Sequence, residues 1–224
     1  MSKATPLALP FAEGASERTP ITRPTNLARS GFHVTAGFVS LALIRLLPGR
    51  WWLFALAAAF ATFAWTSEFL RRRSPEINAK LMSFFGPVAH AHERHHTNSS
   101  TWYVTALTLI AALAPMRGAE LAVLVLGLAD PAAGVVGRRF GRIQLSANRT
   151  LEGTLAFVVV GALASLIWLL ATGAAPVQAL IVALVAGTAG ALAELGSSRR
   201  FDDNFSIPVA VALATGIATS QIAL

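Results

Sequence analysis

The feature that most constrains this chain is a series of seven apolar stretches separated by short polar loops. The stretches cover residues 32–47, 51–69, 101–116, 119–137, 151–172, 176–195 and 206–223. Most of them approach the roughly 20 residues that a helix needs to cross about 30 Å of hydrocarbon. Runs of this length do not alternate as barrel strands do, and no strand pattern is present. We therefore predict an all-α, polytopic transmembrane bundle of about seven crossings, in which the short first and third stretches are tilted or partly re-entrant.

Composition supports a membrane protein and excludes several other classes. Of the 224 residues, 54% are hydrophobic and 13% are charged, whereas soluble domains carry about 25% charged residues. An ordinary soluble enzyme, a disordered chain and a nucleic-acid binder are therefore excluded, and we expect no nucleic-acid partner. Cysteine is absent, which excludes disulfides, thiolate metal sites and cysteine nucleophiles. Nothing in the sequence indicates an oligomeric state.

The distribution of basic residues predicts the topology. Of the 18 Lys and Arg residues, 15 lie in the N-terminal segment through Arg29 or in the loops 70–100, 138–150 and 196–205. Basic loops remain on the cytoplasmic side of membranes, so we place these loops and the N-terminus there. Residues 1–28 are polar and contain four prolines, which predicts a disordered leader. Residues 29–224 form the predicted membrane domain.

An acid inside an apolar stretch is costly and suggests function, and Asp130 is the clearest case. Three glycines fall within roughly 40° of it on the same helix face: Gly134, Gly137 and Gly141. Arg138 and Arg142 lie at the end of this face. A carboxylate, a groove without side chains and two arginines suit a metal-bound polyphosphate. Helix packing through small residues is the alternative, although Pro131 favours function if it breaks the helix and frees backbone groups.

The next stretch opens with Arg149, Thr150 and Glu152. Thr150 or Asn148 is suited to cap a helix with Glu152 in its first turn. Alternatively, the amides of this helix start bind phosphate, with Arg149 beside them. Capping and phosphate binding are about equally supported by the residues alone.

Further acids lie at the predicted boundary before the last stretch. Glu194 ends the sixth stretch, and Asp202, Asp203 and Asn204 follow it. Carboxylates and an amide are good ligands for hard cations. A solvated, capped loop is the alternative reading of this short acidic segment.

Two histidine-containing segments also have alternative interpretations. Residues 92–96 match the H-E-x-x-H zinc protease pattern, for which Asp130 is one possible third ligand. The motif lies in a polar segment, which argues against intramembrane proteolysis; for Glu93 and Arg94 we favour a role at the site. Arg29 and His33 are four residues apart and share a helix face. Snorkelling to the headgroups is the simplest interpretation of that pair.

Together these motifs resemble the CTP-dependent lipid kinase family, which includes dolichol kinase, phytol kinase and eukaryotic-type diacylglycerol kinase. Five segments carry the resemblance, in the order of the family, and the length is that of a compact bacterial member. They are residues 29–33, Glu93 and Arg94 with 98–103, residues 129–142, residues 149–154, and Glu194 with Asp203, Asn204 and Pro208. Two positions depart from the family pattern: Arg149 replaces a lysine, and Ala129 replaces a glycine.

The resemblance implies a kinase in a cell membrane, with its site on the cytoplasmic face. It would transfer the γ-phosphate of CTP to the hydroxyl of a lipid alcohol. Asp130, with Glu152 or Asp203, would hold Mg²⁺, and Glu93 or else Asp203 would accept the proton of the alcohol. The remaining roles fall to two groups. The nucleotide and its phosphates would contact Gly134, Gly137, Arg138, Gly141, Arg142, Arg149, Thr150 and Asn204, while Arg29, His33, Arg94 and Glu194 would support the site.

Two other function classes remain as alternatives. Phosphatidate cytidylyltransferases have a similar stretch around Asp130 and Glu152, but no Lys-Asp or Asp-Arg closing signature follows Glu152 in this chain. A non-enzymatic transport protein would use the buried acids for ion passage. An assay with labelled CTP distinguishes the three classes. Neither the identity of the lipid alcohol nor the preference for CTP follows from the residues themselves.

Overall fold

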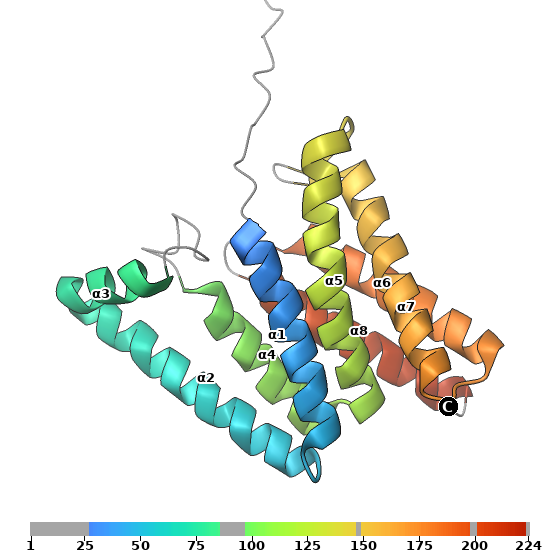
Figure 1. Cartoon of the computed structure of the whole chain (residues 1–224), viewed down its shortest axis with the longest axis horizontal. Coiled ribbons are helices and arrows are strands. Elements are labelled where there is room, and N and C mark those ends of the chain that lie inside the picture. The colour runs from blue at the N-terminus through green and yellow to red at the C-terminus, as the bar shows by residue number, and fades with distance from the viewer. Residues whose placement is uncertain (1–26, 86–96, 147–148, 198–200, 223–224) are drawn as a thin grey trace, which may run out of the picture.

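The computed structural model describes residues 27–85, 97–146, 149–197 and 201–222 as a bundle of helices (Figure 1). This confirms the predicted all-α helical bundle. The helices are α1 Leu27–Leu46, α2 Arg50–Arg73, α3 Pro75–Phe85, α4 Ser99–Leu113, α5 Met116–Phe140, α6 Leu151–Ala171, α7 Pro176–Gly196 and α8 Asp203–Ile222. The predicted leader lies outside the described residues, apart from its last two positions, which begin α1.

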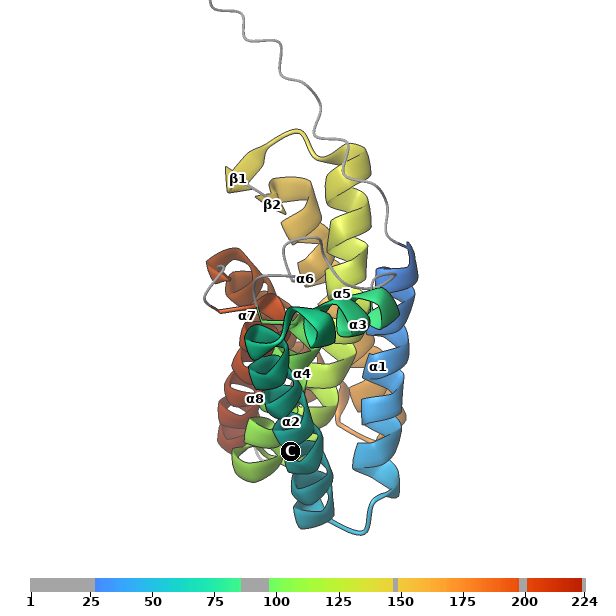
Figure 2. The same cartoon turned by 90° about the vertical axis from the view of Figure 1, so that its left-hand side faces the viewer.

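Four of these helices, α2, α5, α6 and α7, are long and apolar enough to cross a membrane. The helices α1, α4 and α8 run alongside them (Figures 1 and 2). The predicted seven crossings and the cytoplasmic N-terminus stay predictions. Both α2 and α5 extend past the apolar stretches into arginines, reaching Arg73 and Phe140. Arginine is a good helix former, and its charge is favourable at a helix C-terminus, so the helices continue beyond the apolar residues.

Two elements lie in loops for which we expected no regular structure. The helix α3 follows α2 directly, and a hairpin of β1 Gln144–Ser146 and β2 Arg149–Thr150 joins α5 to α6. Strands of three and two residues are too short to show an alternating pattern, so they could not be predicted from the sequence. The hairpin places Arg149 immediately before Thr150, the N-cap of α6.

Helix α5 forms the centre of the bundle, and the residues from Gly118 to Gly127 are buried. Glycines allow its neighbours to approach closely, as is common between membrane helices. A Cβ atom added to Gly37 of α1 would lie 2.9 Å from the Val123 carbonyl oxygen and 3.1 Å from the Gly127 Cα. This contact fixes α1 against α5 one turn beyond His33.

Successive helices are joined so that several helix ends meet at one end of the bundle. Helices α1, α4, α6 and α8 begin there, and α5 and α7 end there (Figures 1 and 2). We call this the site end, and it is the end that the distribution of basic residues predicts to be cytoplasmic. Most of the predicted functional residues lie near these helix ends.

Candidate active site

Asp130 lies on α5 and faces the first helix. Its Oδ2 atom is 3.6 Å from Nδ1 of His33, and the two side chains are 21% and 7% exposed, respectively. Arg149, Arg29 and Asp202 also interact electrostatically with Asp130. The snorkelling interpretation requires His33 to extend to the headgroups. In the structure His33 is instead buried against an acid.

Arg149 connects three helix ends. Its Nε atom is 2.9 Å from Oε1 of Glu194, in the last turn of α7. Its Nη2 atom donates hydrogen bonds to Oδ2 of Asp203 (2.9 Å) and to Oγ of Ser197 (3.3 Å). Since Arg149 itself directly precedes α6, one guanidinium group holds the start of α6 against the end of α7 and the start of α8.

The segment before α8 forms a compact hydrogen-bonded group. The side-chain amide of Asn204 donates to Oδ1 of Asp202 (2.6 Å) and to Oδ1 of Asp203 (3.0 Å). Ser99, at the start of α4, donates to Oδ2 of Asp202 (3.1 Å). Burial raises the pKa of Asp202 and the adjacent Asp203 charge adds to this, while the bonds from Asn204 and Ser99 oppose it. The group is thus held within the bundle, whereas the alternative expected a solvated loop.

We refer to Asp130, Arg149, Glu194, Asp202 and Asp203 as the polar cluster. Four carboxylates and one guanidinium group come from segments separated by up to 73 positions, and the fold brings them together. One buried oxygen, Oε2 of Glu194, has no hydrogen-bond partner among the described residues. The cluster is therefore rich in oxygen ligands that suit a hard cation.

The glycines after Asp130 contact the protein itself. A Cβ atom on Gly137 would lie 3.0 Å from Oγ1 of Thr150, and one on Gly141 would overlap Thr150 and the Gly137 carbonyl. A Cβ atom on Gly134 would lie 3.1 Å from the Arg138 guanidinium group. Close packing of α5 on the start of α6 thus accounts for Gly137 and Gly141. Their role in admitting a nucleotide stays a prediction.

The start of α6 has the predicted cap. Oγ1 of Thr150 accepts a hydrogen bond from the Gly153 amide (3.2 Å). The carboxylate of Glu152 accepts from the Ile143 amide (3.3 and 3.4 Å), which ties the hairpin to α6. Among the described residues, no three His, Asp or Glu side chains are arranged to hold a metal ion. The predicted trio of Asp130, Glu152 and Asp203 is thus not assembled here, and its metal role stays a prediction.

Pro131 does not break α5, which continues through it to Phe140. The expected break of the helix at Pro131 is therefore wrong. A proline inside a helix removes one hydrogen bond, and the surrounding packing can retain the helical path. Arg138 and Arg142, near the end of α5, have exposed side chains. Glu93, Arg94 and the whole 92–96 motif lie outside the described residues.

Comparisons with known proteins support one of the expected families. The chain is 26% identical over 200 residues to CTP-dependent diacylglycerol kinase 1 of Schizosaccharomyces pombe, covering 82% of this chain and 88% of that protein. It is 28% identical to the Eremothecium gossypii protein of the same name, covering 86% and 68%, and 23% identical to that of Saccharomyces cerevisiae, covering 82% and 70%. The resemblance to the CTP-dependent lipid kinase family is confirmed. No family model and no solved structure matches the chain.

The region aligned with the Schizosaccharomyces pombe protein spans the centre of the polar cluster. A continuous match over 82% of the chain must contain the middle of the sequence, and therefore Asp130 and Arg149. Two polar residues that contact the cluster, Ser99 and Ser197, were absent from the predicted site. The adjacent acids Asp202 and Asp203 were visible as a pair, but only the fold shows that Asp202 receives a bond from α4.

Proposed function

We propose that this chain is an integral membrane kinase that transfers the γ-phosphate of CTP to the hydroxyl of a lipid alcohol at the cytoplasmic face. The observation that carries this proposal is the convergence of Asp130, Glu194 and Asp203 on Arg149, at the site end of the bundle. Three relatives named as CTP-dependent diacylglycerol kinases support it. Diacylglycerol is accordingly the first acceptor to test.

The polar cluster fits a magnesium–nucleotide complex by its donor chemistry. Magnesium is usually held by one or two carboxylates together with nucleotide phosphates. The buried Oε2 of Glu194 has no hydrogen-bond partner among the described residues. Asp130 would hold the ion together with either Asp203 or Glu152. When bound, the ion would neutralise charge on the transferring phosphoryl group.

The residues of the chain would position the two substrates. Arg149 pairs with Asp203 and Glu194 in the structure, and its planar group is suited to phosphate oxygens, with Arg138 and Arg142 contributing at the rim. The alcohol oxygen would form a bond to the γ-phosphorus as the bond to the β–γ bridging oxygen breaks and CDP leaves. Asp203 would accept the alcohol proton, or Glu93 would do so if it reaches the site.

The proposal is tested with purified protein in mixed micelles, supplied with Mg²⁺, CTP and one of three alcohols: diacylglycerol, phytol or a polyprenol. We expect a lipid monophosphate and an equal amount of CDP with at least one alcohol. ATP in place of CTP, or chelation of Mg²⁺, should suppress the product. Turnover with none of the alcohols would contradict the proposal, and so would pyrophosphate release from CTP and phosphatidate.

A further inference from the structure

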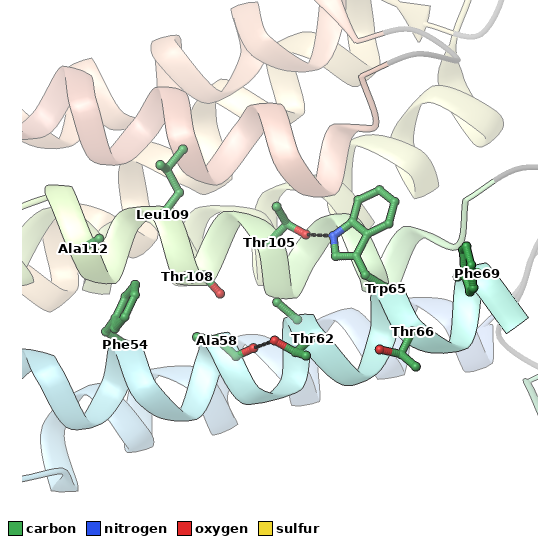
Figure 3. Close-up of a pocket in the computed structure, with 11 residues that line it drawn as sticks. Phe54, Ala58, Thr62, Trp65, Thr66, Phe69, Thr105, Thr108, Leu109 and Ala112 are labelled. Carbon is green, nitrogen blue, oxygen red and sulfur yellow. Dashed lines mark hydrogen bonds between the residues drawn. The ribbon is translucent and has the colours of Figure 1, made fainter.

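A groove of about 740 Å³ lies between α2 and α4, away from α6 and α7 (Figures 1 and 3). Phe54, Ala58 and Trp65 of α2 line one side, and Thr105, Leu109 and Ala112 of α4 line the other. We call it the α2–α4 groove. Helix α2 is long enough to cross a membrane, but only 22% of its 18 most apolar consecutive residues are buried within the protein. The predicted membrane crossing of α2 places the open side of this groove toward the lipid.

Three of the four threonines that line the α2–α4 groove form hydrogen bonds within their own helices. The hydroxyl groups of Thr62, Thr105 and Thr108 donate to the carbonyls of Ala58, Thr101 and Val104, four residues earlier in their own helices, at 2.8, 2.6 and 2.8 Å. The Trp65 indole donates to Oγ1 of Thr105 at 3.0 Å (Figure 3). Side chains that satisfy their hydrogen bonds locally present mainly carbon to the groove. Such a wall suits hydrocarbon and offers little to a polar ligand.

A row of aromatic rings connects the α2–α4 groove to the polar cluster. The ring of Trp65 lies 5.9 Å from that of Trp102, which lies 5.7 Å from that of Phe205. Phe205 belongs to the first turn of α8, which begins with Asp203. Ser99, one turn before Trp102, donates to Asp202. These packed rings extend along α4 from the groove to the start of α8, where the acids lie.

We propose that the α2–α4 groove holds a hydrocarbon chain of the lipid alcohol and presents the hydroxyl to Asp202 and Asp203. This inference rests on the proposed kinase function. Ala112 lies 13 residues beyond Ser99 on α4, a distance of about 20 Å along the helix. Only a long chain fills that length, so the groove selects long-chain alcohols and admits them sideways from the bilayer.

Photocrosslinking tests this placement without requiring catalysis. The full chain is reconstituted in phosphatidylcholine vesicles with a diacylglycerol that carries a diazirine at the end of one acyl chain. We expect the label on peptides of α2 and α4 that contain Ala58 and Ala112, and we expect unlabelled dioleoylglycerol to compete. Labelling elsewhere in the bundle would overturn the proposal. So would equal competition by added phosphatidylcholine, which would make the groove a general lipid site.

Turnover provides the second test. Ala58→Phe and Ala112→Phe fill the α2–α4 groove, whereas Ala59→Phe alters an exposed position of α2 outside it. The two filling variants should raise KM for dioleoylglycerol about tenfold or more, and leave dioctanoylglycerol turnover within about twofold. Ala59→Phe should match the wild type with both substrates. Equal KM values in all three variants would overturn the groove assignment. If the wild type phosphorylates no alcohol, the kinase function fails instead, and crosslinking still decides the groove.

Discussion

Arg149 and Glu194 form an ion pair, with 2.9 Å between Nε and Oε1, although 45 positions separate them in the chain. The Arg149 side chain is 21% exposed and that of Glu194 is 6% exposed. The same guanidinium group bonds Asp203. One partly buried cation therefore balances carboxylates from two other helices. A phosphate group that approached this site would compete with those carboxylates for Arg149.

Replacing Arg149 should abolish most turnover. Arg149→Ala removes the group that joins α6 to α7 and α8, and we expect kcat to fall by about 10²–10³, the usual loss for one stabilising donor. Arg149→Lys should fall less, because it keeps the charge and loses the planar contact to two carboxylates. Arg139→Ala is the control, since Arg139 is exposed and lies over Phe140. Unchanged kcat in Arg149→Ala would contradict its role at the site.

Asp130→Asn should remove turnover while the protein still folds. The substitution keeps the shape of the side chain beside His33 and removes the charge that the proposed metal requires. We expect at least about a 100-fold loss of kcat. The same acid-to-amide change in the exposed Glu76 of α3 is the control and should have no effect. Monodisperse elution in detergent checks folding, and full activity in Asp130→Asn would contradict the metal assignment.

Gly37→Ala should weaken the contact between α1 and α5. The added Cβ atom would lie 2.9 Å from the Val123 carbonyl oxygen, and overpacking of this kind costs about 1–3 kcal/mol. Turnover should fall as well, because His33 lies one turn away on α1. Gly31→Ala provides a matched control, since a Cβ atom there meets nothing within 4 Å. Thermal unfolding in detergent makes the comparison, and equal midpoints for the two variants would argue against the close approach.

A buried ion pair at the end of α2 should be important for stability. Nη2 of Arg71 lies 2.7 Å from Oε2 of Glu68, and both side chains are 4% exposed. Glu68 also accepts a bond from the Asn98 amide just before α4. Arg71→Met leaves the exposed Arg72 as the one cation near this carboxylate among the described residues, and a broken buried pair costs about 3–5 kcal/mol.

The matched control for Arg71→Met is Arg73→Met, two positions further along α2. Arg73 is exposed and lies over the Phe69 ring, so its loss should change the unfolding midpoint little. Similar midpoints for the two variants would show that the Arg71–Glu68 pair does not fasten α2 to α4.

The sequence predicted the helices well because each apolar stretch is long and uninterrupted. Helix α6, for example, covers Leu151–Ala171 against an expected 151–172. The hairpin with β1 and β2 was missed because pairing in so short a loop depends on how α5 and α6 meet. The break at Pro131 was wrong because the packing of α5 decides its path more strongly than one lost hydrogen bond does.

For the site, residue types were predictable but contacts were not. Arg149, Glu194 and Asp203 were each selected by their charge near an apolar boundary, and the fold then joined them. Nothing in the sequence indicated that Ser99 would reach Asp202 across 103 positions. The glycines after Asp130 show the converse limit: their spacing fits both a ligand groove and helix packing, and contacts with Thr150 account for two of them.

The central claim is that this chain transfers the γ-phosphate of CTP to a lipid hydroxyl. Membranes containing the protein are supplied with diacylglycerol and with CTP labelled at either the γ or the α phosphorus, and the lipid is extracted and counted. We predict label in the lipid from the γ position and none from the α position, with Asp130→Asn membranes as the background. Label transferred from the α position would instead identify cytidylyl transfer and contradict the account.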